Sequence, residues 1–230
     1  MKKFALLSII LILCLNLTSC INITRNIKVN KDGSGSEFVI LNFDKTFFDV
    51  MMAFATIGDS SRVIEVRDSL YNDDDFISDF KQKLSNVDGL VLKEIYSTTN
   101  EDSSKTMYIR YDFDRIDLLG ISMGSSRDEV LSGKVTVLYE DQGENLKFSY
   151  LQEDSREQET ENDSTYANLM EGVAEMFKGK EAVYNIEFSY EVLSSNAQLQ
   201  DGRLLKWVYQ MDDMVLNGNN VYLEAILKKD

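Results

Sequence analysis

Apolar and polar residues alternate along several short segments of the chain, which is the pattern of β-strands with one buried face. The clearest case is 22–31, where one face carries Ile23, Arg25, Ile27 and Val29. The other face of this segment is polar throughout. A second segment, Phe38–Phe43, is rich in β-branched and aromatic residues, so we expect it to pair with the first as a β-hairpin.

The connection between these two segments is Asp32-Gly33-Ser34-Gly35, which has the composition of a tight turn. A calcium loop is the sharper alternative, but its closing acid would fall at Leu41 and its flanks would be helices. A phosphate loop would need a third glycine and a following helix. The sequence therefore favours a hairpin turn.

Similar alternation predicts further strands along the chain. Segments 89–98 and 106–113 flank the polar turn 99–104, and segments 133–140 and 145–152 flank a turn at 141–144. Later strands are expected at 184–193, 204–211 and 221–227. Because the strands come in hairpin pairs and not in regular strand–helix–strand units, most pairing should be antiparallel.

Three segments are expected to be helical, and the last of them begins at Ser164 and ends at Gly179 with Tyr166, Leu169, Met170, Val173 and Phe177 on one face. The helix expected after Asn72 has an acidic first turn and an apolar face formed by Phe76, Ile77, Phe80 and Leu84. The segment 44–57 is strongly apolar and lacks a clean polar face, which indicates deep burial or contact with something apolar. If an apolar ligand is bound here, its lining would include Phe47, Phe48, Met51 and Phe54; the alternative is a core helix packed on the sheet.

These elements together predict an α+β fold, a mostly antiparallel sheet built from hairpins with helices packed on one face. Residues 20–230 are long enough for a single domain with a sizeable core. The acidic run 153–163 is expected to be a solvated linker within it.

The amino terminus has the pattern of a signal peptide. Lys2 and Lys3 precede an apolar run over 4–15 that is too short to span a bilayer. The run ends at Leu17-Thr18-Ser19-Cys20, which matches the lipobox of bacterial lipoproteins. Residues 1–19 would then be removed and Cys20 would carry two or three acyl chains; the alternative is a plain signal peptide or an uncleaved anchor.

Lipidation also explains the cysteine usage. Cys14 lies in the segment expected to be removed, so Cys20 would be the only cysteine of the mature chain and would have no disulfide partner. Ile21 follows Cys20 in place of the aspartate associated with inner-membrane retention. We therefore expect an outer-membrane protein facing the periplasm in a cell with two membranes, and a protein on the outer face of the cell membrane otherwise.

Charge and composition narrow the function. The 230-residue chain has 24 basic and 39 acidic residues, and the mature chain would have a net charge of −17. This argues against nucleic acid as a partner and against docking on anionic headgroups. Histidine, the commonest general base and metal ligand, is absent from the sequence. No catalytic or metal-ligand pattern stands out, so we predict no enzyme, no metal and no cofactor.

Motifs at both ends of the chain resemble the LppM-type domain of bacterial lipoproteins. The lipobox is followed by a strand and Asn30-Lys31-Asp32-Gly33-Ser34-Gly35. Near the carboxyl end come segment 186–192, Ser195-Asn196-Ala197, Asp201-Gly202-Arg203 and Lys206-Trp207. The proline that often enters the late strand of that family is missing here. The resemblance implies an α/β envelope domain without established catalysis, in contact with envelope lipids, and it transfers no active-site residue.

The sequence thus predicts a membrane-anchored envelope lipoprotein whose domain binds a lipid or a protein partner without catalysis. One alternative is a structural or assembly subunit of an envelope complex. Another is a carboxylate-dependent hydrolase, which would need two convergent carboxyl groups, one with a raised pKa.

Overall fold

The computed structural model describes residues 21–55, 63–120, 135–153, 174–175, 177–218 and 220–229. The strands of this part are β1 (Ile21–Val29), β2 (Gly35–Phe43), β3 (Leu90–Thr99), β4 (Lys105–Phe113), β5 (Val135–Asp141), β6 (Asn145–Gln152), β7 (Glu181–Phe188), β8 (Glu191–Ser195), β9 (Leu199–Asp201), β10 (Leu204–Gln210) and β11 (Val221–Lys228). The helices are α2 (Lys45–Ala55), α3 (Val63–Tyr71), α4 (Asp74–Ser85), α7 (Met211–Asn217) and the short 3₁₀ helix η2 (Ile116–Gly120).

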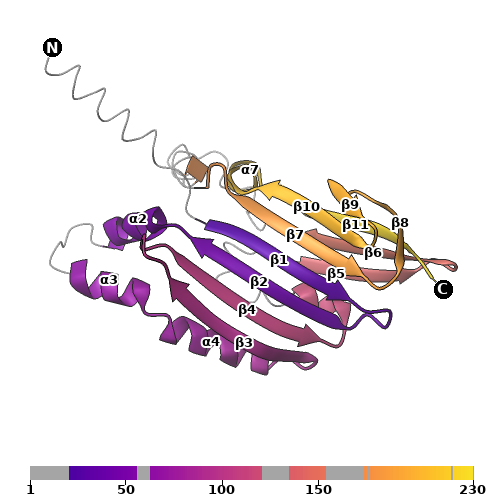
Figure 1. Ribbon diagram of the computed structural model, residues 1–230, viewed down its shortest axis with the longest axis horizontal. Coiled ribbons are helices and arrows are strands. Elements are labelled where there is room, and N and C mark those ends of the chain that lie inside the picture. Colours follow the sequence, from indigo (N-terminus) through magenta and orange to yellow (C-terminus); the bar gives the residue numbers. More distant parts are fainter. Residues whose placement is uncertain are drawn as a thin grey trace, which may run out of the picture.

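Seven strands form one twisted sheet in the order β3-β4-β2-β1-β7-β10-β9 (Figure 1). The hairpin expected at the amino end is present, since β1 pairs with β2 from Ile21 opposite Phe43 to Val29 opposite Gly35. The other neighbour of β1 is β7, which runs parallel to it. This pair joins segments about 160 residues apart, and the remaining pairs of the sheet are antiparallel.

A second sheet, in the order β5-β6-β11-β8, stacks on one face of the first and overlaps its β7–β10 side in Figure 1. Aromatic rings from the two sheets meet in the core. Phe148 on β6 packs edge-on against Phe188 on β7 with ring centroids 5.2 Å apart, and Tyr150 lies 5.8 Å from Tyr184. The main core therefore lies between two sheets.

The helix α4 covers another part of that same face. α4 packs along β3, with Ile77, Phe80 and Leu84 contacting the core as the amphipathic pattern predicts. At its start, Asp73 accepts a hydrogen bond from Lys105 of β4 at 2.6 Å. The helices therefore occupy only one part of a face that the second sheet shares.

The predicted fold class is wrong: the described chain is mostly β, with two sheets, one of them mixed, and few helices. The error has a physical source. Local periodicity reveals strands and hairpins, but it carries no signal for pairing between distant segments such as β1 with β7 or β6 with β11. It also predicted one strand over 184–193, whereas β7 ends at Phe188 and β8 begins in the other sheet at Glu191.

Two hairpin turns share one geometry. In Asn30–Ser34 the side chain of Asp32 accepts hydrogen bonds from the amide of Ser34 at 3.0 Å and from its hydroxyl at 2.6 Å. In Asn100–Ser104 the corresponding bonds measure 2.9 and 2.6 Å. The hairpin interpretation of the first turn is confirmed, because its aspartate is held inside the turn between two strands.

Four predictions concern residues outside the described part of the chain. They are the signal peptide over 1–19, the lipidation site Cys20 with its lipobox, nearly all of the linker over 153–163, and most of the helix over 164–179. Within the described ranges, no helix has the length and apolar character needed to cross a membrane.

Candidate functional site

The predicted apolar lining lies on α2, at the end of the large sheet where β1 begins. The sequence places α2 there because β2 ends at Phe43, opposite Ile21, and the chain turns into the helix two residues later. The ring of Phe47 lies 5.3 Å from that of Phe43 and 5.3 Å from that of Phe48. The structure therefore brings these aromatic residues together as one cluster.

Phe48 belongs to the core of this cluster. It is 4% exposed and stacks on Tyr71 of α3 with ring centroids 4.6 Å apart. The Lys105 ammonium lies 5.9 Å from the Phe48 ring centre and 5.6 Å from that of Tyr71, and it donates to the Tyr71 carbonyl at 2.9 Å. Lys105 is thereby fully engaged by rings, a carbonyl and Asp73.

A cavity of about 210 Å³ lies between α2 and α3. Its lining consists of Lys45, Phe48, Asp49, Met52, Arg67, Tyr71 and Ser103. The volume is below the 300–1,000 Å³ usual for ligand pockets. Of the four predicted lining residues, only Phe48 reaches it; Phe47 contacts the ring cluster, Met51 is exposed, and the side chain of Phe54 lies outside the described part.

A larger cleft crosses the opposite face of the seven-stranded sheet, which neither the second sheet nor the described helices cover. The cleft measures about 590 Å³ and extends from β4 across β2, β1 and β7 to β10. We call it the outer cleft; the outward-facing side chains along it are Asn26, Lys28, Ser36, Phe38, Arg110, Asp112, Asn185, Glu187 and Leu204.

The alternation of the strands places these side chains outward. On β1, Arg25 and Ile27 point into the core, so Asn26 and Lys28 between them face the cleft. The amide of Asn185 donates to that of Asn26 across the parallel β1–β7 pair at 3.0 Å. The Arg110 guanidinium lies 4.8 Å from the centre of the Phe38 ring on the neighbouring strand.

The charged groups of the outer cleft are balanced by neighbours. Lys28 pairs with Glu187 at 3.1 Å, Arg110 with Glu94 at 3.1 Å, and Asp112 with Lys93 at 2.9 Å. Further aromatic side chains lie beside Phe38. The ring centroids of Phe38 and Tyr108 are 6.1 Å apart, and those of Tyr108 and Tyr96 are 4.8 Å apart. The surface is therefore locally neutral, amide-rich and aromatic, although the chain as a whole is strongly acidic.

Sequence reasoning did not assign a role to the outer cleft. Two sequence features mark the side chains that line this cleft. One is the polar face of 22–31, and the other is the alternation of Tyr108 and Arg110 with Ile109 and Tyr111. A polar strand face is normally read as solvated, and only the pairing of β1 with β7 brings Asn26 and Asn185 together.

In the part of the chain that the structure describes, Asp32, Asp102, Asp141 and Glu224 have lowered pKa values. Hydrogen bonds from Ser34 and Ser104 lower the pKa values of Asp32 and Asp102, and Lys147 and Tyr222 do the same for Glu224. A general acid for glycoside hydrolysis needs the opposite shift. In the same ranges, no three Cys, Asp or Glu side chains gather as a metal site would require.

Comparison with known proteins shows a likeness of fold to solved structures. No family model matches the chain, and no curated protein matches it. Among solved structures, the NMR structure of the folded domain of the Mycobacterium tuberculosis LppM protein aligns over 91% of this chain and 90% of that one, with 11% identity and a TM-score of 0.44. The likeness expected from the sequence motifs is thus found, but it is too distant to transfer a function or a site.

Proposed function

We propose that this chain is a membrane-anchored lipoprotein whose domain binds a protein partner, without catalysis, through the outer cleft. The observation that carries the binding role is the face of the large sheet that none of the described elements covers, with a 590 Å³ cleft across five strands. The anchoring role depends on the Leu17-Thr18-Ser19-Cys20 motif directly before β1.

The chemistry of the outer cleft favours a protein over a lipid. A lipid chain covering this surface would remove the Lys28–Glu187 pair and the Asn26–Asn185 amides from water without replacing their hydrogen bonds, which is costly. A polypeptide can satisfy such groups with its own amides. Protein interfaces are also enriched in aromatic residues and arginine, as in the Phe38–Arg110 contact.

The position of the outer cleft suits a tethered protein. Asn26 and Lys28 lie five and seven residues beyond Ile21 along β1, which is roughly 17 and 23 Å at the rise of an extended strand. A partner could therefore reach the cleft without touching the residue that carries the anchor.

The anchor is tested with Cys20→Ser in the cell that makes the protein. We expect the native protein to incorporate labelled fatty acid and to sediment with membranes, and the variant to lose both. A variant that stays as firmly bound as the native protein would contradict lipidation at Cys20.

The binding surface is tested by photo-crosslinking from defined positions in the anchored protein. A crosslinking residue replaces Ser36 in the outer cleft or, as a control, Leu138, which is 46% exposed on β5 of the other sheet. We expect a discrete protein adduct from position 36 only, and its loss when Arg110→Glu is added. Adducts from both positions, or adducts that Arg110→Glu leaves unchanged, would contradict a partner in the cleft.

A further inference from the structure

At the end of the domain where β1 begins, apolar side chains on two helices are exposed or half-buried. On α2, Met51 is 37% exposed and its neighbours Phe47 and Val50 are half-buried. On α3, which packs against α2, Val63 is 38% and Ile64 is 66% exposed. We call these five residues the anchor-end surface.

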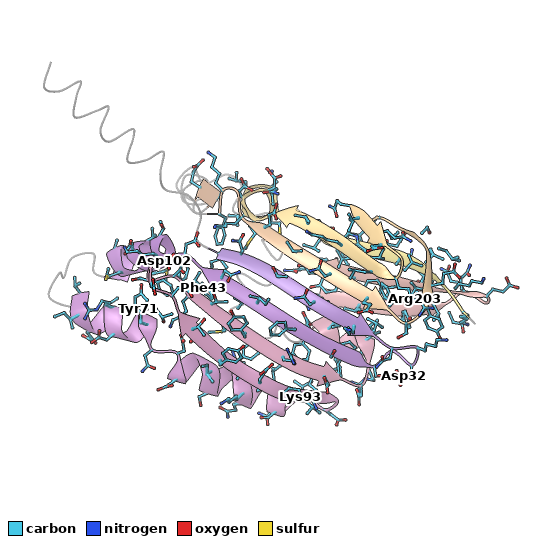
Figure 2. All side chains as sticks on the ribbon, in the orientation of Figure 1. Asp32, Phe43, Tyr71, Lys93, Asp102 and Arg203 are labelled. Carbon is cyan, nitrogen blue, oxygen red and sulfur yellow. The ribbon has the colours of Figure 1, made fainter. Side chains whose placement is uncertain are left out.

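Several contacts fix this surface beside the start of β1. Phe43, opposite Ile21, packs on Phe47 of α2. Lys180 pairs with Asp44, the residue before α2, at 2.7 Å. α2 and α7 lie toward the same end of the strands in Figure 1, and Phe43, Tyr71 and Asp102 mark that end in Figure 2.

The opposite end of the domain has a different character. Asp32 and Arg203 mark it in Figure 2, and its surface carries the ion pairs Lys228–Glu191 and Lys229–Asp141. Leu193, 48% exposed, is an isolated apolar side chain there beside Lys228 and Lys229. Exposed apolar side chains such as Val91 and Leu204 occur at this end too, but those at the anchor end lie together on two contacting helices.

We infer that the anchor-end surface rests on the lipid bilayer, with Met51 and its neighbours in the interfacial region. This rests on the proposed lipidation of Cys20. A single peptide bond joins Cys20 to Ile21, so an acylated Cys20 places the start of β1 about 3.8 Å from an atom held at the membrane. With so short a tether, some part of this end must face the lipid, and the apolar side chains of α2 and α3 are the part that lipid solvates best.

The charges nearby indicate which lipid surface fits. Lys45 is paired with Asp49, Arg67 with Asp68 at 3.2 Å, and the adjacent turn contributes the exposed acid Asp102. This is not a basic patch for anionic headgroups. Contact should therefore come from apolar insertion, persist on phosphatidylcholine, and change little with salt.

The test uses the natively acylated full protein in phosphatidylcholine vesicles. With Cys20 acylated and residues 1–19 removed, a cysteine introduced by Met51→Cys is the only free thiol and can carry an environment-sensitive fluorophore. Leu193→Cys, an apolar position at the far end that is somewhat more exposed than Met51, is the matched control. Quenching is measured with brominated acyl chains in the bilayer, and flotation of the same samples reports membrane attachment.

We expect the label at position 51 to shift to the blue and to lose about half of its fluorescence to brominated lipid, with little change at position 193. The result should be the same at low and high salt. Equal quenching at both positions, or none at position 51 in protein that floats with the vesicles, would overturn the bilayer contact while leaving the anchor intact. Protein isolated without acyl chains would overturn the anchor and the contact together.

Discussion

Arg25 is the buried charge on which the junction of the two sheets depends, and removing it should destabilise the domain strongly. The side chain is 2% exposed and pairs with Glu37, which is 1% exposed, on the neighbouring strand. It also donates to the Tyr150 hydroxyl of the second sheet at 2.8 Å and to the Leu119 carbonyl at 3.1 Å. Glu37 in turn accepts from the Tyr111 hydroxyl.

The magnitude follows from what Arg25→Met leaves behind. Burial alone would lower the pKa of Arg25, but Glu37, Tyr150 and Tyr111 raise it above its usual value, so the Arg25 guanidinium stays charged in the core. The variant leaves the Glu37 carboxylate buried with Tyr111 as its remaining donor among these contacts. Breaking a buried pair from one side typically costs about 3–5 kcal/mol, which is a large part of the roughly 5–15 kcal/mol by which an ordinary domain is stable.

The assay is urea unfolding of the unacylated Cys20→Ser chain, followed by the fluorescence of Trp207, the only tryptophan. Trp207 is 1% exposed on β10, so unfolding should change its emission. For a chain of this size, the expected loss in the free energy of unfolding corresponds to a fall in Tm of about 6–20 °C in a thermal unfolding experiment. The exposed pair Lys28–Glu187 supplies the control, since Lys28→Met should stay within about 0.5 kcal/mol.

The double variant Arg25→Met/Glu37→Leu tests the reasoning itself. Because the second change removes the stranded carboxylate, the double variant should cost less than the sum of the two single variants, by about 2 kcal/mol. Single variants that each cost under about 1 kcal/mol, or costs that simply add, would show that Arg25 and Glu37 do not stabilise the domain as a buried pair.

Three further predictions concern turns and close contacts. Ser103 has φ 66° in the second hairpin turn, so Ser103→Gly should raise the free energy of unfolding by about 0.5–1 kcal/mol in urea titrations, and no gain would contradict strain there. A Cβ at Gly35 would lie 2.0 Å from the Lys28 carbonyl oxygen, so Gly35→Ala should cost about 2 kcal/mol or more and lower Tm, and a neutral result would refute this close approach. Hydrogen bonds lower the pKa values of Asp32 and Asp102 in the folded protein, so both carboxylates stabilise the fold at pH values above their unfolded pKa of about 3.9. This stabilisation is lost as the pH falls through their folded pKa values. The midpoint of urea unfolding should therefore fall less steeply with decreasing pH in this range when both residues are changed to Asn.

Local sequence signals predicted the hairpins of this fold and their turns. The alternation in 22–31 put Arg25 on the same face as Ile27 and Val29, and the structure buries all three. The turn at Asp32 was recognisable because aspartate, glycine and serine each have a defined conformational role there. The helix α4 was recognisable from its period and its acidic start.

The second sheet and the outer cleft were beyond such signals. Both depend on pairings between distant segments, β6 with β11 and β1 with β7, and nothing in a single strand specifies its partner across more than 70 residues. The apolar segment 44–57 was correctly interpreted as helical, but its sequence could not separate the side that packs on Tyr71 from the side that stays exposed. Phe48 and Met51 are one helical turn apart and have opposite surroundings.

The two proposed surfaces are linked by the direction of β1. The strand begins beside the proposed anchor and is about 26 Å long from Ile21 to Val29. If α2 and α3 rest on the bilayer, β1 runs away from it. The outer cleft, which includes Asn26 and Lys28, then lies in the half of the domain that is farther from the lipid. The same orientation turns the charged far end toward water, where its paired lysines and acids keep their hydration. An anchor at the opposite end of β1 would reverse both conditions, because it would place ion pairs against lipid and expose Met51 and Ile64 to water. On this proposal, the position of the lipidated cysteine therefore decides whether the outer cleft is accessible to a partner.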